Sequence, residues 1–308
     1  MARYAVLDIG TNSMKYLLAE HSPEGLEILR DELNITRLGE SLQETGQIPF
    51  MVMERNLNAI REFKQISDEY QVDEFILFST AVLRRAENAD AFVGLVRKEL
   101  NLSIRILSEE EEAELAYEAV TDRLQEKSLI YMIFDIGGGS TEFIISSQGE
   151  VIDKISLPVG ALVMTDRFIK TDPPTQEEIK TADAYLQTVL QKHFTYKEVD
   201  TILTIGGTVT TLAAVKIGLQ EYDAHSIDGL NLTINDVKSM INYFAGLDLE
   251  SRMKVQGLHP QRADIILAGT LIVKAIMEVT SKDIITVCDC GIRHGMMNSI
   301  VRRNSEIT

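Results

Sequence analysis

Two stretches of this chain repeat one another and decide its fold. "FDIGGGSTEFII" runs from Phe134 to Ile145 and places three glycines between two apolar runs. "LDIGTNSMKYLL" runs from Leu7 to Leu18 and aligns with it without a gap. The matched residues are Asp8 with Asp135, Gly10 with Gly137, and Ser13 with Ser140. Such an internal repeat predicts two similar halves, each with one glycine turn.

The pattern of elements around each glycine turn also repeats. In the first half we expect three strands, then a helix, a strand, a helix, a strand and a helix, at 3–9, 13–20, 26–35, 50–70, 75–80, 88–100, 103–107 and 109–124. In the second half we expect strands at 129–137, 141–147, 149–157, 199–207 and 283–291, and helices at 160–169, 175–193, from about 208, 234–244, 262–279 and 292–301. This order predicts a duplicated α/β fold, with a ligand cleft between its halves.

Composition limits the classes of protein to which this chain can belong. The 308 residues are 45% hydrophobic and 25% charged, as in ordinary globular proteins of about two domains. No apolar run approaches the length of a membrane span, and the N-terminus lacks a signal-peptide pattern, so we expect a cytoplasmic protein. The net charge of −17 disfavours nucleic-acid and membrane partners. Cys288 and Cys290 are expected to be reduced thiols. Whether the chain forms a homodimer stays open.

The two glycine turns have the composition of phosphate-binding turns. Glycine allows a ligand to approach the backbone closely, and successive N–H groups in such a turn can bind an anion. Hydroxyl groups add donors at both turns. The predicted phosphate ligands are Thr11, Asn12 and Ser13 in the first turn, and Gly138, Gly139, Ser140 and Thr141 in the second.

A third glycine signal lies in "TIGGTVTTLAAV", Thr204 to Val215, where a strand passes into a helix. Backbone N–H groups at a helix N-terminus favour phosphate, so Gly207 and Thr208 are further candidates. A tight strand–helix turn without a ligand explains the glycines equally well.

The repeats differ at one informative position. Lys15 in the first copy corresponds to Glu142 in the second, and each lies on the same strand face as the aligned serine. Lys15 suits a phosphoryl oxygen, whereas Glu142 with Asp135 suits Mg²⁺, and Asp8 is a further candidate ligand. A simpler alternative is that Lys15 and Glu142 are solvated side chains of their strands.

The acidic run "SEEEEAELAYEAV", Ser108 to Val120, contains one carboxylate that differs from the rest. Ser108 and Glu111 form a capping-box pattern. Glu112 falls on the apolar stripe of the expected helix, where burial favours general-base chemistry. Two roles stay open for Glu112, that of a structural carboxylate and that of a general base. Arg84 and Arg85 follow the strand at 75–80, and one of them can bind phosphate.

Taken together, these residues and motifs resemble those of the Ppx/GppA phosphatases, that is, exopolyphosphatases and guanosine pentaphosphate phosphohydrolases. The matching stretches are "LDIGTNSMKYLL", "STAVLRRAEN", "SEEEEAELAY", "FDIGGGSTE", "TIGGTVTTLAA", "GLHPQRADIILAG" and "CDCGIRHG". The resemblance implies a duplicated actin-like, ribonuclease H-like fold with an interdomain cleft. Its domains would be 1–124, joined by the C-terminal helix 292–308, and 125–291. The chain resembles the short form, without an additional C-terminal helical domain.

The resemblance also implies an activity and roles for individual residues. The activity is release of terminal orthophosphate from linear polyphosphate with Mg²⁺ or another divalent cation, and pppGpp is the alternative substrate. Glu112 would be the general base, Arg84 the phosphate-binding arginine, and Asp135 and Glu142 the metal-associated acids. Lys15 stands where the family usually has Arg, and Glu109 where it often has Gly. An actin-like kinase and a nucleotide-binding scaffold remain alternatives from other classes.

Overall fold

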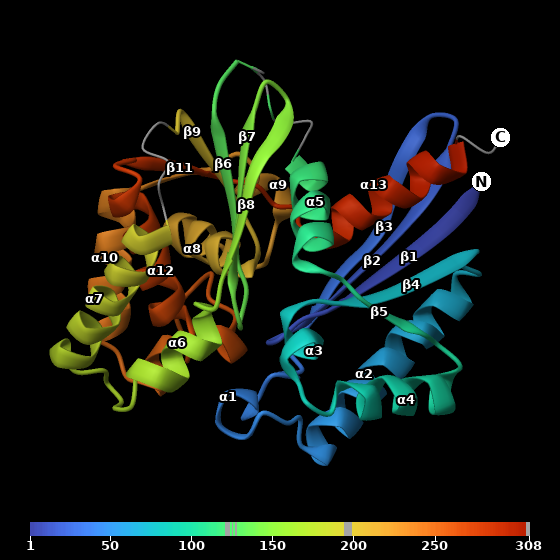
Figure 1. The fold of residues 1–308 in the computed structure, drawn as a ribbon, viewed down its shortest axis with the longest axis horizontal. Helices are drawn as coiled ribbons and strands as arrows, with labels where there is room; N and C mark the ends of the chain where they lie inside the picture. The colour runs from blue at the N-terminus through green and yellow to red at the C-terminus, as the bar shows by residue number, and fades with distance from the viewer. Residues whose placement is uncertain (121–123, 125, 127, 194–198, 306–308) are drawn as a thin grey trace. The chain divides into compact units, whose positions relative to one another are not determined.

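The computed structural model describes residues 1–120, 124, 126, 128–193 and 199–305. The chain divides into two compact units, one made of Met1–Thr121 and Gly291–Thr308 and the other of Asp122–Cys290. Each unit is built on one sheet (Figure 1). Among the described residues, no helix is long and apolar enough to cross a membrane.

The sheet of the first unit has five strands in the order β3-β2-β1-β4-β5. β1 pairs with β2, and β2 with β3, in antiparallel fashion, whereas β1 pairs with β4, and β4 with β5, in parallel. β1 is a nearly continuous buried apolar run, as expected of a strand covered on both faces. The strands are β1 Ala2–Ile9, β2 Met14–Ser22, β3 Gly25–Asn34, β4 Glu74–Ser79 and β5 Ile104–Ile106.

Helices cover both faces of this first sheet (Figure 1). The apolar sides of α2 and α4 pack on one face, against side chains such as Leu7 and Tyr16. α13 lies on the other face, against β1 and β2, and α5 packs on α13. The helices described in this unit are α1 Leu42–Thr45, α2 Phe50–Glu69, α3 Ala81–Arg85, α4 Ala89–Leu100, α5 Glu109–Val120 and α13 Ile292–Ser305.

The sheet of the second unit has six strands in the order β10-β11-β9-β6-β7-β8. Its pairing repeats that of the first sheet, with β6, β7, β8, β9 and β11 in place of β1 to β5, and β10 adds an antiparallel edge. The duplicated α/β fold is therefore confirmed. The strands are β6 Tyr131–Ile136, β7 Thr141–Ser147, β8 Glu150–Leu157, β9 Thr201–Ile205, β10 Asn231–Thr233 and β11 Ile284–Val287.

The core of the second unit is organised by α12, whose residues are almost all buried. A helix that is apolar on all sides must be surrounded, and α6, α7, α8 and α10 all contact it. The helices described in this unit are α6 Ala161–Phe168, α7 Gln176–His193, α8 Gly207–Ile217, α9 Ala224–Ile227, α10 Ile234–Ala245, α11 Leu249–Arg252, the 3₁₀ turn η2 Pro260–Arg262 and α12 Ile266–Val279.

Several of the expected ends of helices and strands were wrong. The helix expected at 262–279 begins at Ile266, because the preceding residues form the turn η2. The strand expected at 283–291 ends at Val287, so both cysteines follow it, as buried free thiols. The helix expected at 109–124 is described to Val120, and 121–123 lie outside the described residues. The short strand β10 was not expected.

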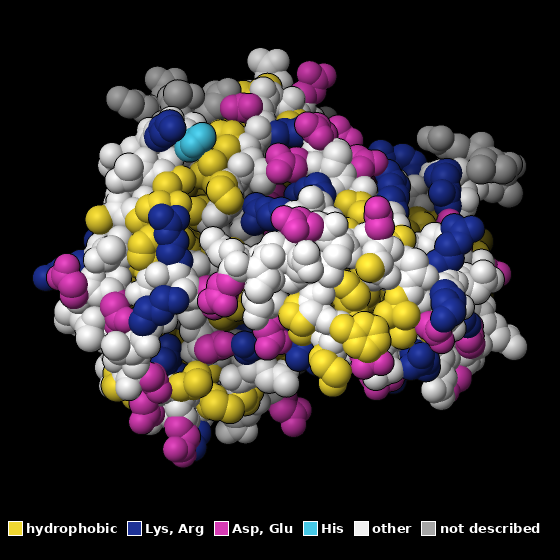
Figure 2. Space-filling model, turned by 60° about the horizontal axis from the view of Figure 1, so that its bottom comes forward, with side chains coloured by type: hydrophobic (Ala, Val, Ile, Leu, Met, Phe, Trp, Pro, Cys, Tyr) yellow, Lys and Arg dark blue, Asp and Glu magenta, His cyan; other side chains and the backbone are white. Residues whose placement is uncertain are grey.

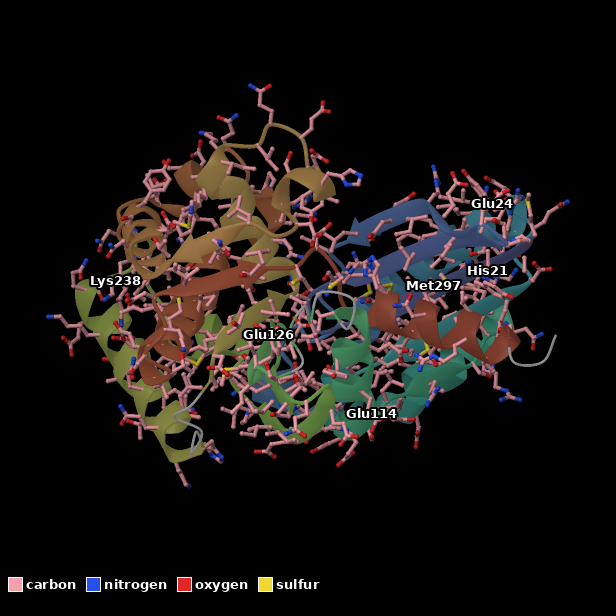
Figure 3. All side chains as sticks on the ribbon, turned by 90° about the horizontal axis from the view of Figure 1, so that it is seen from above. His21, Glu24, Glu114, Glu126, Lys238 and Met297 are labelled. Carbon is pink, nitrogen blue, oxygen red and sulfur yellow. The ribbon has the colours of Figure 1, made fainter. Side chains whose placement is uncertain are left out.

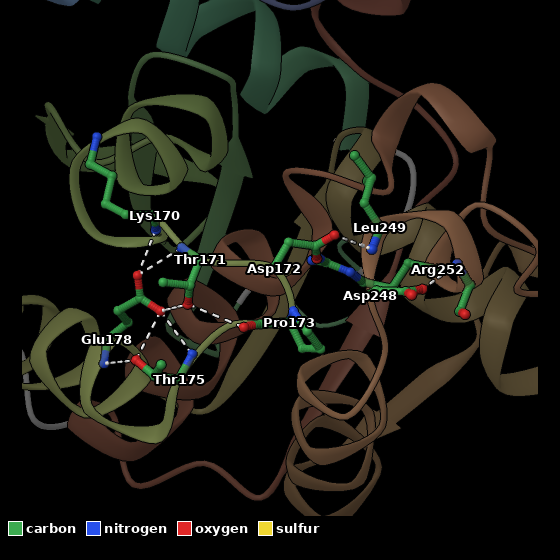
Figure 4. Close-up of polar contacts among 10 residues, drawn as sticks. Lys170, Thr171, Asp172, Pro173, Thr175, Glu178, Asp248, Leu249 and Arg252 are labelled. Atoms are coloured by element: carbon green, nitrogen blue, oxygen red, sulfur yellow. Dashed lines mark hydrogen bonds and ion pairs between the residues drawn. The ribbon is translucent and has the colours of Figure 1, made fainter.

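A polar network fixes the loop that precedes α7 (Figure 4). The Glu178 carboxylate accepts hydrogen bonds from the backbone N–H groups of Lys170, Thr171 and Thr175, and from both threonine hydroxyls. Bonds from Thr171 and Thr175 lower the pKa of Glu178 to about 2. On the same loop, Asp172 accepts from the buried Arg252. Thr175, the last residue of the stretch "TDPPT", therefore caps the N-terminus of α7 together with Glu178.

Charges of both signs are interspersed on the face shown in Figure 2. Lys and Arg side chains alternate there with Asp and Glu rather than gathering in a field of one sign. Local donors must therefore decide where an anion binds on a chain with a net charge of −17.

Candidate functional site

The two glycine turns close with the same hydrogen bond. In the first unit, Gly10 N–H donates to Ser13 O over 3.0 Å. In the second, Gly137 N–H donates to Ser140 O over 2.9 Å. The repeat seen in the sequence is thus a repeat of local backbone structure.

The carbonyls of the first turn are held by the segment that follows β3. Gly39 N–H donates to Thr11 O and Arg37 N–H donates to Asn12 O, each over 2.9 Å. In a trans peptide, the N–H points opposite to the C=O. The N–H groups of Asn12 and Ser13 therefore point away from that segment, in the direction that a bound anion requires.

The second turn is held in a similar way by α6. Ala161 N–H donates to Gly137 O over 2.9 Å, and Leu162 N–H donates to Gly138 O over 3.0 Å. By the same peptide geometry, the N–H groups of Gly138 and Gly139 point away from α6. Space is tight here, because a Cβ on Gly160 would lie 2.4 Å from the Gly138 carbonyl.

The hydroxyls predicted to assist the turns differ in their surroundings. Ser13 and Ser140 are both buried. Thr141 is fully buried, and its hydroxyl donates to Val159 O over 2.5 Å. In this conformation the Thr141 hydroxyl serves the fold. Asn12 Oδ1 is buried without a hydrogen-bond partner among the described residues.

The third glycine signal forms the N-terminus of α8. Gly206 has φ 92°, a left-handed conformation that favours glycine, and the helix begins at Gly207. A Cβ on Gly206 would lie 2.0 Å from Asp135 Oδ1, so the Asp135 carboxylate lies against this turn. Thr208, the other candidate here, is buried.

Arg262 is a charged residue that the sequence analysis did not single out. A Cβ on Gly207 would lie 2.1 Å from Arg262 Nη1, so the buried guanidinium fills the space that this glycine leaves. Burial lowers the pKa of Arg262, while the charges of Tyr222 and Asp135 oppose that change. Arg262 lies in the stretch "GLHPQRADIILAG", but nothing local in that stretch indicates that this arginine meets Gly207.

The position where the repeats differ is a cross-strand pair in both units. Asp8 lies opposite Lys15 in the β1–β2 register, and Asp135 lies opposite Glu142 in the β6–β7 register. Opposite residues share one face of an antiparallel pair. The first unit therefore has an acid–base pair where the second has two buried carboxylates.

The carboxylate pair fits a divalent cation. Two like charges placed opposite one another repel, and a bound cation removes that repulsion. Mg²⁺ takes few carboxylates and keeps water and phosphate oxygens as its other ligands. Among the described residues, no group of three or more His, Cys, Asp or Glu side chains could hold a metal ion. Asp135 and Glu142 thus fit an ion shared with a phosphate substrate better than a closed structural site.

Glu112 lies in the first turn of α5 and is only 4% exposed. The other residues of the predicted apolar stripe, including Leu115 and Ala116, are buried as well. The capping box is confirmed, since Ser108 N–H donates to Glu111 over 2.8 Å and Glu111 N–H donates to Ser108 Oγ over 3.1 Å. The cap holds Glu111 at the helix end, while Glu112 points to the buried side.

Arg84 and Glu112 form an ion pair. Arg84 Nη1 lies 2.7 Å from Glu112 Oε2 and also donates to Leu107 O over 2.8 Å. The Arg84 side chain is 18% exposed, whereas Arg85 is exposed on the same short helix, α3. The structure thus brings together two residues that the sequence analysis assigned to separate roles.

Comparisons with known proteins identify the family of this chain. A family model described as the Ppx/GppA phosphatase family matches residues 17–304. A solved structure, the Aquifex aeolicus member of the Ppx/GppA protein family, is 34% identical to this chain. It covers 98% of each chain, with a TM-score of 0.83.

Two curated relatives show how much of each protein the similarity spans. Exopolyphosphatase 2 of Mycobacterium tuberculosis is 26% identical, over 97% of this chain and 99% of its own length. A bifunctional 3-dehydroquinate synthase/phosphatase of Fusobacterium nucleatum is 29% identical over 92% of this chain, and the chain spans 44% of that protein. The family match, the solved structure and the repeated sheets together show that this chain belongs to the Ppx/GppA phosphatase family.

Proposed function

We propose that this protein is an exopolyphosphatase, a hydrolase that releases terminal orthophosphate from linear inorganic polyphosphate. The observation that carries the proposal is the buried carboxylate of Glu112, paired with Arg84 Nη1 at 2.7 Å. A fixed carboxylate with a polar partner is suited to general-base chemistry on water. The family and the similarity to an exopolyphosphatase supply the substrate class.

In the proposed step, a water oxygen attacks the terminal phosphorus in line with the bridging oxygen. The new P–O bond forms as the bond to the bridging oxygen breaks, and the water gives one proton to the Glu112 carboxylate. Orthophosphate leaves on one side, and the shortened chain leaves with the former bridging oxygen. Positioning and charge stabilisation account for most catalysis of this reaction type.

Backbone donors would hold the phosphate oxygens. The N–H groups of Asn12, Ser13, Gly138 and Gly139 point away from the segments that hold their turns, which supports this role. Thr11, Ser140, Gly207 and Thr208 are further proposed ligands, and Lys15 adds a positive charge. These local donors would allow an anion to bind despite the net charge of −17, because they act at short range, whereas the field of the whole chain is screened by salt.

Asp135 and Glu142 would hold Mg²⁺ or another divalent cation, with Asp8 as a further candidate. When bound, the ion would supply positive charge that offsets the charge developing on the phosphoryl oxygens. Arg84 is proposed to orient Glu112 in addition to binding phosphate, since its guanidinium already contacts the carboxylate.

The experiment compares orthophosphate release from polyphosphate, pppGpp and ATP at equal concentrations of terminal phosphate, with Mg²⁺ present. We expect the highest kcat/KM with polyphosphate, and oxygen from labelled water in the released orthophosphate. A higher kcat/KM with pppGpp would change the substrate to the guanosine nucleotide while leaving the chemistry intact.

Two other outcomes would contradict the proposal. Consumption of ATP only when a sugar or an organic acid is added, with phosphate appearing on that acceptor, would identify a kinase. Binding of ATP without turnover of any of the three substrates would identify a scaffold.

A further inference from the structure

The C-terminal helix α13 is fixed to the first sheet at both of its ends. Near its start, Arg293 forms two hydrogen bonds with Asp31 of β3, over 2.9 and 2.8 Å. Near its end, Arg303 contacts both carboxylate oxygens of Glu74 in β4, over 2.8 and 2.6 Å. Burial alone would raise the pKa of Asp31, but the bond from His294 and the charge of Arg293 hold it below its usual range.

The two ion pairs join α13 to strands on either side of those that it covers. β3 and β4 flank β2 and β1 in the sheet order, and α13 contacts β1 and β2. α13 is therefore bonded at both of its ends to the strands on either side of the pair that it covers.

α5 packs directly on α13. A Cβ on Gly295 of α13 would lie 1.9 Å from the carbonyl oxygen of Leu115 and 2.7 Å from its carbonyl carbon. These are backbone atoms, so no side-chain rotation can relieve the contact. Arg302 of α13 and Glu118 of α5 form an ion pair farther along. Figures 1 and 3 both show the two helices side by side, and Figure 3 labels Glu114 on α5 and Met297 on α13.

Glu112 lies one helical turn before Leu115, on the same side of α5. Any displacement of α5 from α13 at Leu115 therefore moves the Glu112 carboxylate, while Arg84 stays on a different helix, α3. The backbone contact at Gly295 thus limits where α5, and with it Glu112, can lie.

We propose that α13 is the element that positions Glu112, and that Gly295 is a positioning residue for the reaction. This inference rests on the proposed function, in which Glu112 acts on the attacking water. Gly295 touches neither substrate nor water in this account. It sets how closely α5 approaches α13, and thereby the position of the Glu112 carboxylate.

The direct test is Gly295→Ala. Contacts of a Cβ under 3.0 Å are essentially never seen, so a contact at 1.9 Å must open by at least ~1 Å. A displacement of about 1 Å at a catalytic group can cost about 100-fold in rate. We expect kcat to fall about 100-fold, with KM for polyphosphate changed far less, because the proposed phosphate ligands lie outside α5 and α13.

Gly94→Ala is the matched control. Gly94 lies inside α4 of the same unit, and a Cβ there would meet nothing within 4 Å. This variant should keep the kcat of the wild type. A fall of kcat in Gly94→Ala as large as in Gly295→Ala would overturn the inference.

A double-mutant cycle separates positioning from general damage. If Gly295 acts through Glu112, Gly295→Ala should lower the rate about 100-fold in the wild type and leave the residual rate of Glu112→Gln unchanged. An equal loss in both backgrounds, or a Gly295→Ala variant with full kcat, would overturn the inference. A Glu112→Gln variant with full activity would instead overturn the proposed function, so the two failures are distinguishable.

Arg302→Gln covers the case in which Gly295→Ala does not fold. It removes the ion pair between α13 and α5 without adding volume. We expect about a 3-fold fall in kcat, in keeping with a partly exposed ion pair, and no fall in the Glu112→Gln background. Unchanged kcat in a folded Arg302→Gln variant would then overturn the inference.

Discussion

The guanidinium of Arg84 lies 2.7 Å from the carboxylate of Glu112, and the Glu112 side chain is almost completely buried. Each partner comes from a different helix, α3 or α5, so the pair depends on the packing of the first unit. A buried charge pair of this kind contributes little when intact, but it is costly to break from one side. We therefore expect Arg84 to matter for stability as well as for the proposed reaction.

Replacing Arg84 with Gln should destabilise the protein by about 3 kcal/mol, the lower end for a broken buried pair, because the Arg84 side chain is 18% exposed. Urea unfolding at neutral pH measures this loss. Arg85→Gln, at the exposed neighbouring position, should stay within about 0.5 kcal/mol of the wild type. Equal unfolding midpoints for Arg84→Gln and Arg85→Gln would show that the ion pair does not form in solution.

Replacing Glu142 with Gln should have opposite effects on stability with and without Mg²⁺. In the presence of a chelator, the variant should be more stable than the wild type by up to about 1 kcal/mol. The reason is that Glu142, which faces Asp135, loses its charge in the variant. With Mg²⁺ at about 100 times its Kd, the wild type should gain about 2.7 kcal/mol, and the variant much less. Thermal unfolding in both conditions measures the difference.

The matched control for this prediction is Lys15→Gln, at the equivalent position of the first unit. It should leave the stabilisation by Mg²⁺ unchanged. Orthophosphate release that continues unchanged after thorough chelation would show that Asp135 and Glu142 do not act through a metal ion.

Much of this architecture could be predicted because its causes are local. The glycine turns follow from the repeat, and strand alternation predicts the faces on which Lys15 and Glu142 lie. The burial of Glu112 follows from helical periodicity. In each case, residues within about a dozen positions of one another carry the information.

The contacts that could not be predicted join segments far apart in the chain. The guanidinium of Arg262 fills the space at Gly207, and Gly295 meets the backbone of Leu115. Both contacts depend on how helices pack, which no local pattern determines. The ion pair of Arg84 with Glu112 has the same origin, so the sequence predicted the two residues without predicting that they meet.

Replacing Glu178 with Gln should destabilise the second unit by about 1 kcal/mol at neutral pH, as for loss of a helix cap. The folded protein holds the pKa of Glu178 at about 2, below the unfolded value of about 4.3. Its contribution is therefore complete above the unfolded pKa and is lost as the pH falls from there through about 2.

Urea unfolding between about pH 7 and pH 3 tests this dependence. The difference between wild type and Glu178→Gln should be constant down to about pH 5 and should shrink below it. Glu177→Gln, at the exposed preceding position, is the control and should show no such trend. A difference that grows as the pH falls would contradict the assigned role of Glu178.

In the proposed reaction, Glu112 activates the water that releases orthophosphate. The most direct measurement is the kcat for orthophosphate release from polyphosphate by Glu112→Gln, with Mg²⁺ present and the fold checked by thermal unfolding. Glu114→Gln, at an exposed position on the same helix, is the control. We expect the kcat of Glu112→Gln to be about 10²- to 10⁴-fold below that of the wild type, and the kcat of Glu114→Gln to be unchanged. A folded Glu112→Gln protein that releases orthophosphate at the wild-type rate would show that Glu112 does not activate the water.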